Sequence, residues 1–395
     1  MKRIVFLLGI LAFPFAANAE NSPKVDIIGD GEYEVCDFTV DGIHYSIVND
    51  SSVEVCWEWR HVPPRGSITV HKGYDFLEGS DLVIPSEVTY NGKTYSVVSI
   101  WPGLFSRMSF KSVTLPSTMV AKLHNGCSLE ATFGYCSELE TVNLPPVNVT
   151  MGVQTFNDCT SLKNIDLSYC EHLGNKCFMN CEQLETVSFA AQEVFLGNEC
   201  FLNAGLTSVN FSPSIEKLSI GEGCFSLTKL ESIVIPAVDT SIGSYAFASC
   251  LYLKHVTVGC EKFYHWGFIG CTQLELTLLP TTQILDEEFL LNNMLKSIVC
   301  YAPVPPIWRR TVHKNNEPDY TLPVAYVPEE YIDLYRAADY WKDMVIEPLE
   351  STGIPCVEIS QEDKADDNWY NLNGQRVSTP GKGIFIHNGK KVLVK

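Results

Sequence analysis

The sequence lacks the residue patterns that most often mark catalysis or cofactor binding. It contains no C-x-x-C pair, no G-x-S-x-G turn, no H-E-x-x-H helix, no glycine-rich phosphate loop and no EF-hand loop. It also has no pair of histidines spaced to share one helical face, the usual arrangement of a zinc site. These absences predict a protein that is not an enzyme, with no catalytic or metal-binding residues and no cofactor.

Cationic side chains are scarce. The chain has 28 Lys and Arg residues against 47 Asp and Glu residues, for a formal net charge of −19. Proteins bind nucleic acid and anionic lipid largely by neutralising phosphates, which an acidic surface does not do. We therefore expect no nucleic-acid partner and no binding to a membrane surface, and we interpret the charge as an aid to solubility.

Long hydrophobic runs are missing except at the start of the chain. Lys2 and Arg3 precede an apolar run from Ile4 to Phe15, and Ala17-Asn18-Ala19 forms a small-residue cleavage site. This pattern predicts a signal peptide over residues 1–19, because the run is too short to span a bilayer. The mature protein is then exported to the periplasm, the cell surface or the medium, without an integral membrane segment.

The middle of the chain repeats a phenylalanine about every 22 residues. The series is Phe105, Phe133, Phe156, Phe178, Phe201, Phe225, Phe247, Phe268 and Phe289. A Leu or another bulky apolar residue follows each Phe by five or six positions, and Val or Ile follows three positions later in most units. A fixed period of about 20–29 residues is typical of leucine-rich repeats. We expect a solenoid of about nine units over residues 100–301, with successive strands pairing in parallel into one long sheet.

Eight of the fifteen cysteines fall at two positions of the same period. One group lies three residues after the Phe (Cys136, Cys159, Cys181, Cys250 and Cys271), and another lies directly before it (Cys177, Cys200 and Cys224). Both positions should face inward, where a thiol acts as a small hydrophobic group. Buried thiols are the first interpretation, and disulfides or metal ligands the alternative. Cys36 and Cys56 lie outside the array and are the best disulfide candidates.

Charges next to the repeated Leu alternate in sign. The column contains Lys111, Glu140, Lys163, Glu185, Thr207, Glu231, Lys254, Glu275 and Lys296. Opposite charges on neighbouring strands favour the register, so we interpret this column as a structural ladder. The outward strand positions, which include Asn164, Asp166, Thr186 and Ser188, are mostly small and polar. Such a face offers hydrogen bonds but few anchors.

The repeat unit resembles that of the BspA-type (Treponema-like) leucine-rich-repeat family. Ser241-Ile242-Gly243 is followed by Ala246-Phe247-x-x-Cys250-x-x-Leu253-x-x-Val256, which is the family pattern. The resemblance implies a right-handed, β-dominated array and a bacterial secreted or surface protein that binds host proteins or other cells. It carries over no catalytic residues. Pro ends only some units, and several units lack the Cys.

The flanks of the array are predicted to be caps. Residues 20–99 should form a β-rich N-terminal cap, with a hairpin turn at Asn91-Gly92. The sequence APVPP from Ala302 should end the strand register, and residues 302–350 should form a strand–helix C-terminal cap with a helix from Pro328 to about Ala338. Residues 351–367 form an acidic linker. The tail, 368–395, is either a small β unit or a sorting signal.

Aromatic side chains are the best candidates for recognition. Trp57 and Trp59 alternate and should share one side of a strand, whereas Tyr264, His265 and Trp266 lie on a connector between repeats. Packing within the cap is the alternative for the first pair. We expect protein–protein interaction, with adhesion to host extracellular-matrix proteins or bacterial surface proteins. The alternative function is a glycan-binding module of the cell surface, suggested by the paired tryptophans.

Overall fold

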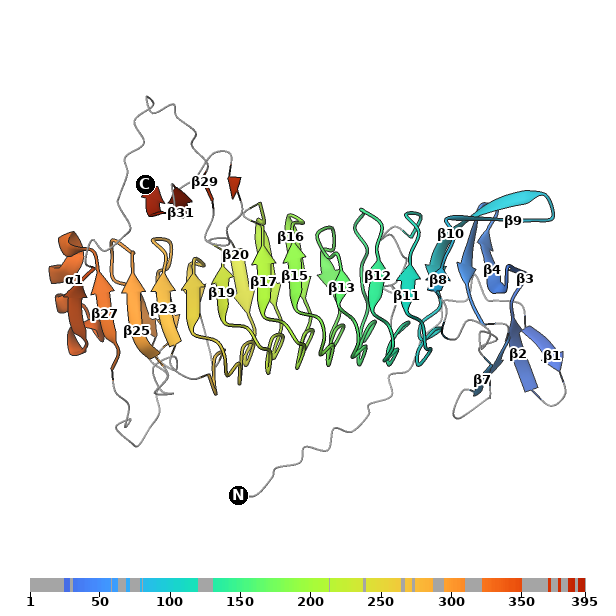
Figure 1. Ribbon diagram of the computed structural model, residues 1–395, viewed down its shortest axis with the longest axis horizontal. Helices are drawn as coiled ribbons and strands as arrows, with labels where there is room; N and C mark the ends of the chain where they lie inside the picture. Colours follow the sequence, from blue (N-terminus) through green and yellow to red (C-terminus); the bar gives the residue numbers. More distant parts are fainter. Residues whose placement is uncertain are drawn as a thin grey trace, which may run out of the picture.

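The structure is a computed structural model. It describes residues 25–28, 31–57, 59–62, 69–71, 79, 81–119, 131–212, 214–236, 239–263, 267–271, 274–286, 295–309, 322–349, 369–370, 376–377, 383–387 and 390–394. The predicted signal peptide lies outside these residues. Figure 1 shows an elongated stack of parallel strands with additional β-strands at its N-terminal end and a short helix at its C-terminal end. The predicted β-dominated repeat solenoid is therefore confirmed.

The strands of one side of the stack form the first ladder. It consists of three successive sheets. The first contains β8 (Asp81–Val83), β11 (Ser112–Thr114), β12 (Thr141–Asn143) and β13 (Asn164–Ile165), and the second contains β15 (Thr186–Phe189) and β17 (Ser208–Phe211). The third contains β19 (Ser232–Ile235), β21 (His255–Val258), β23 (Leu274–Leu278), β25 (Leu295–Cys300), β27 (Val324–Val327) and β28 (Val345–Pro348). All neighbours within each sheet pair in parallel.

A second ladder of parallel strands is formed by the return segments of the units. It contains β14 (His172–Leu173), β16 (Glu193–Leu196), β18 (Lys217–Ile220) and β20 (Asp239–Ile242), followed by β22 (Lys262–Phe263), β24 (Ile284–Asp286) and β26 (Ile307–Arg309). The prediction of one long sheet was wrong in two ways. The first ladder is divided into three sheets. The return segments also form strands, because each unit has an alternation of apolar and polar residues on both sides of its core.

The repeated phenylalanines form a continuous column of stacked rings between the ladders. From Phe105 to Phe268, successive ring centroids are 4.9–5.7 Å apart and the rings are tilted by 1–17°. Each ring and the repeated Leu beside it are buried. One unit could not cover its own apolar face, so the stacking of identical positions is what stabilises the array. The inward placement of Phe and Leu is thereby confirmed.

The periodic cysteines are buried and link neighbouring units. The Cys136 thiol donates to the Phe105 carbonyl of the preceding unit at 3.1 Å. The same contact, from a thiol to the Phe carbonyl of the preceding unit, is made by Cys159, Cys181, Cys250 and Cys271. The structure describes thirteen cysteines, all as thiols, and all except Cys36 are buried. Burial raises the pKa of the Cys271 thiol to about 12, so it remains protonated and acts as a small core residue.

The N-terminal cap contains two sheets. One is antiparallel, with β1 (Val25–Ile28), β2 (Gly31–Val35), β6 (Trp59–Val62) and β7 (Thr69–His71); the other contains β3 (Phe38–Val40), β4 (Ile43–Asn49), β5 (Ser52–Val55), β10 (Lys93–Ile100) and β9 (Glu87–Tyr90). The predicted hairpin turn is confirmed, since Asn91 and Gly92 join β9 to β10 with φ angles of 51° and 76°. The first strand of the parallel ladder, β8, comes from within the predicted cap segment.

Two further predictions about the flanks need correction. Trp57 and Trp59 do not share a strand, because β5 ends at Val55, level with Ile100 of its partner β10, and Trp59 begins β6 in the other sheet. The register also does not end at Ala302. Strand β26 continues the second ladder and β27 and β28 continue the first, because a parallel strand needs only a paired neighbour and an apolar inner face.

The C-terminal helix is confirmed close to its predicted position. Pro328 precedes a 3-10 turn, η4 (Glu329–Tyr331), and the helix α1 (Ile332–Ala337), which is followed by η5 (Trp341–Asp343). The side chains of Tyr335 and Trp341 are buried; Tyr335 donates to the Ala302 carbonyl at 2.7 Å and Trp341 to the Pro306 carbonyl at 2.8 Å. The helix therefore closes the end of the core. The tail forms an antiparallel sheet of β29 (Trp369–Tyr370), β30 (Arg376–Val377), β31 (Gly383–His387) and β32 (Lys390–Val394).

Candidate binding surfaces

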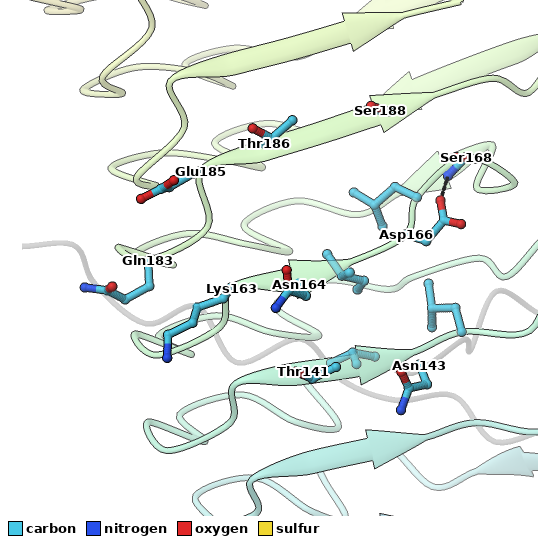
Figure 2. A pocket seen from close by; sticks show the side chains of 14 residues that line it. Thr141, Asn143, Lys163, Asn164, Asp166, Ser168, Gln183, Glu185, Thr186 and Ser188 are labelled. Atoms are coloured by element: carbon cyan, nitrogen blue, oxygen red, sulfur yellow. Dashed lines mark hydrogen bonds between the residues drawn. The ribbon is translucent and has the colours of Figure 1, made fainter.

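A large hollow lies on the outer face of the first ladder, over β12, β13 and β15. Its volume is about 910 Å³, within the general range of roughly 300–1,000 Å³ for ligand sites. Figure 2 shows polar side chains along its wall. The labelled residues are Thr141, Asn143, Lys163, Asn164, Asp166, Ser168, Gln183, Glu185, Thr186 and Ser188. We call this hollow the first-ladder groove.

The groove forms where the first ladder is divided. Strand β13 ends at Ile165, and no strand pairing joins it to β15, although every residue from 131 to 212 is described. The Asp166 carboxylate accepts the backbone N–H of Ser168 at 2.9 Å, which turns the chain away from the strand direction. Beyond this gap, the Ala190 N–H donates to the Ser168 carbonyl and joins the segments that follow the two strands. The missing pairing opens the face of the sheet.

The charges of the groove are unequal. Lys163 is paired with Glu140 at 2.8 Å, and this contact lowers the pKa of the Glu140 carboxyl. Asp166 and Glu185 add two further carboxylates to the wall, and within the described part of the chain no cation lies within ion-pairing distance of Glu185. The groove therefore has an acidic balance, with hydroxyl and amide groups around it. A basic, polar partner surface would complement it.

The predicted charge ladder is realised in part. Lys163 pairs with Glu140, and Lys296 pairs with Glu275 at 2.8 Å. Lys111 departs from the prediction, since its ammonium contacts Glu138 at 3.0 Å. These pairs are exposed, so they contribute little to stability and are screened by salt.

Replacing Lys296 with methionine should remove the pH-dependent contribution that the Lys296–Glu275 pair makes to the stability of the fold. The hydrogen bond from Lys296 lowers the pKa of the Glu275 carboxyl below its ordinary value of 4.5. A lowered carboxyl pKa stabilises the fold above pH 4.5, and this contribution disappears as the pH falls through the lowered pKa. In thermal unfolding at low salt, Lys296→Met should therefore melt slightly below the wild type at pH 7, and this difference should become smaller at pH 3. An equal difference at both pH values would contradict the ladder.

The aromatic candidates from the sequence occupy different environments. The Trp57 side chain is only 9% exposed and lies edge-on to Trp101, with ring centroids 5.3 Å apart. It packs within the cap and is not available as a surface anchor. Trp59 lies in β6, where the structure describes the backbone alone. Tyr264, His265 and Trp266 lie outside the described residues. Of these five residues, the structure therefore describes the side chain of Trp57 alone.

Sequence reasoning missed three surface features. The first-ladder groove is one, although its wall residues were expected to face outward. A second is a stacked pair of rings on the second ladder, His172 and Phe195. The third is an apolar set on the turns after Phe225 and Phe247, where Leu251 and Tyr252 are 61% and 59% exposed. Two sequence features could have indicated the second and third surfaces: the dipeptide His172-Leu173, and the apolar pair Leu251-Tyr252 at positions where other units carry polar residues.

Two kinds of site are not found in the described part of the chain. No group of three or more His, Cys, Asp or Glu side chains gathers there in a way that could hold a metal ion. Within the same residues, no helix has both the length and the apolar character needed to cross a membrane.

Comparison with known proteins gives one family match and several remote structural similarities. Residues 98–219 and 218–308 match the family model described as BspA type Leucine rich repeat region, in six copies. A leucine rich cell surface protein from Faecalibacterium prausnitzii is 18% identical with a TM-score of 0.46, over 78% of this chain and 90% of that chain. No curated protein matches.

Two further solved structures are similar. A leucine-rich repeat protein from Bacteroides ovatus is 18% identical with a TM-score of 0.29, over 79% of this chain and 98% of that one. The pneumococcal vaccine antigen PcpA is 15% identical with a TM-score of 0.38, over 82% and 99% of the two chains.

Proposed function

Because the chain belongs to the BspA-type leucine-rich-repeat family, we propose that it is a non-catalytic, exported repeat protein that binds other proteins. Its first-ladder groove is the binding surface, and its partners are host extracellular-matrix proteins or surface proteins of other bacteria. The signal-peptide pattern at residues 1–19 supports export, which places the protein in the periplasm, on the cell surface or in the medium.

The observation that carries the proposal is the groove itself. Many of the side chains that line it are short and polar and leave room for a partner segment. The core beneath it is closely packed, with Phe156 and Phe178 fully buried, so a partner meets a preformed surface. Asp166 and Glu185 give the groove an excess of negative charge. Lysine and arginine side chains are therefore the groups that a partner should present, and attraction between the two surfaces should raise the association rate at low salt.

The test is adhesion of the mature protein, residues 20–395. Its binding to immobilised extracellular-matrix proteins and to bacterial cells should be saturable, and it should weaken clearly when the salt concentration is raised from about 50 mM to about 500 mM. An unrelated protein of similar negative net charge serves as a control for non-specific attraction. Absence of saturable binding to every surface tested would overturn the proposed function.

Glycan binding through Trp57 and Trp59 is a weaker candidate. The burial of Trp57 against Trp101 removes the exposed ring that a sugar would need at that position. A glycan that bound the wild type and lost affinity in a folded Trp59→Ala variant would restore this candidate.

A further inference from the structure

We propose that the second ladder carries a separate binding site for a neutral sugar ring, as found in a glycan. The site is a hollow of about 470 Å³ at the start of the ladder, beside β14 and β16. Its lining residues are Thr150, Met151, Gly152, Val153, His172, Leu173, Gly174, Asn175, Phe195, Leu196, Gly197 and Ser219. We call this hollow the second-ladder hollow.

The imidazole of His172 provides an open ring face. One face lies against the Phe195 ring, with centroids 4.5 Å apart and an angle of 5° between the planes. The His172 side chain is nevertheless exposed, so its exposed area must belong to the opposite face and the ring edge. The bridge between Met151 and Leu173 places the shorter Thr150 next to His172 on that opposite side. A ring could therefore stack on the imidazole above Thr150.

The Phe195 ring of this stacked pair also contacts Lys217. Lys217 lies over Phe195, with its ammonium 5.4 Å from the ring centroid, and it comes from the strand on the far side of β16 from His172. Phe195 is thus enclosed by His172 and Lys217, which fixes its plane and that of the imidazole stacked on it. A prearranged ring loses little conformational freedom when a ligand binds.

Polar groups surround the open ring face. The Asn175 Oδ1 atom accepts the backbone N–H of Asn198 at 2.8 Å, which fixes the amide and leaves its two N–H donors for a ligand. Thr150 also lines the hollow. Gly174 and Gly197 also line the hollow, and they allow close stacking of the units, because a Cβ atom at either position would lie 2.4–2.5 Å from the backbone of the preceding unit. An apolar ring face with hydrogen-bonding groups at its rim matches the two sides of a sugar ring.

The charge of the hollow indicates a neutral ligand. None of its lining residues is Asp, Glu, Lys or Arg, in contrast to the first-ladder groove, which contains Lys163, Asp166 and Glu185. A basic protein segment would find no carboxylate there, and an acidic sugar would find no cation in the lining. The volume exceeds the minimum of roughly 300 Å³ for a small-molecule site and would accommodate a short part of a glycan chain.

The test uses the mature protein and an array of neutral oligosaccharides, followed by calorimetric titration of the best ligand. His172→Ala should weaken binding about tenfold, because it removes the stacking face. His172→Phe keeps a ring and should retain most of the affinity. His255→Ala is the matched control, since His255 is an exposed histidine of the first ladder, and it should leave glycan binding unchanged. Thermal melts verify that all three variants remain folded.

Three results would overturn the proposal. The array could show no neutral glycan bound by the wild type, or His172→Ala could bind the glycan as tightly as the wild type. His172→Ala could also weaken binding to a protein partner while no glycan binds, which would make the hollow part of a protein interface. Since the site lies outside the first-ladder groove, these outcomes leave the adhesion test of the groove intact.

Discussion

Replacing Phe201 with alanine is expected to lower the free energy of unfolding by about 3–5 kcal/mol. Phe201 lies in the middle of the ring column, between Phe178 at 5.2 Å and Phe225 at 5.4 Å, and its side chain is fully buried. Removing the ring leaves a cavity that the two neighbouring units cannot fill, because each is held in register by its own hydrogen bonds. Chemical denaturation with circular dichroism measures the loss.

The matched control is Tyr169→Ala. Tyr169 is an aromatic residue of the same array, but its side chain is exposed. We expect this variant to change the free energy of unfolding by no more than about 0.5 kcal/mol, as is usual for surface substitutions. Similar losses in the two variants would contradict the conclusion that the stacked column holds the units together.

Replacing Gly221 with alanine is expected to destabilise the array by about 3 kcal/mol, at the upper end of the range for overpacking. A Cβ atom at position 221 would lie 2.5 Å from the carbonyl carbon of Gly197 and 2.6 Å from the backbone nitrogen of Asn198. Both contacts are with backbone atoms of the preceding unit. The spacing between units would therefore have to increase locally, against the hydrogen bonds that join β16 to β18.

Gly134→Ala provides the comparison for Gly221→Ala. The nearest atom to a Cβ at position 134 is the Gln154 carbonyl oxygen at 3.3 Å, so a small displacement relieves the contact. The free energy of unfolding of this variant should fall by less than about 1 kcal/mol. Equal stability of the two alanine variants would show that the units are less tightly stacked than the structure indicates.

The sequence predicts the core of this fold well because the same residue types return at the same depth in every unit. Phe201, Leu206 and Val209 each belong to such a column, and all are buried. The second ladder was harder to predict. Strands such as Lys217–Ile220 are four residues long, and whether so short a segment pairs depends on its neighbours in space. The continuation of the register beyond Ala302 was missed for the same reason.

The binding surfaces could be predicted only in part. The outward direction of Asp166 and Ser188 follows from the alternation of the strands, but the groove depends on the missing pairing between β13 and β15, which is a property of two units together. The exposed face of His172 likewise depends on the unit before it. Trp57 shows the opposite case, since an aromatic residue that looked suitable for recognition packs against Trp101.

The most direct test of the account compares two arginine substitutions on the first ladder. Ser188 lines the groove, whereas Thr257 is an equivalent outward position on β21, outside it. Ser188→Arg adds bulk and positive charge where a basic partner should bind, so adhesion to the partner identified by the binding screen should fall at least about tenfold. Thr257→Arg makes the same change in net charge and should bind like the wild type. Equal binding by the two variants, or a greater loss in Thr257→Arg, would contradict the assignment of the groove as the binding surface.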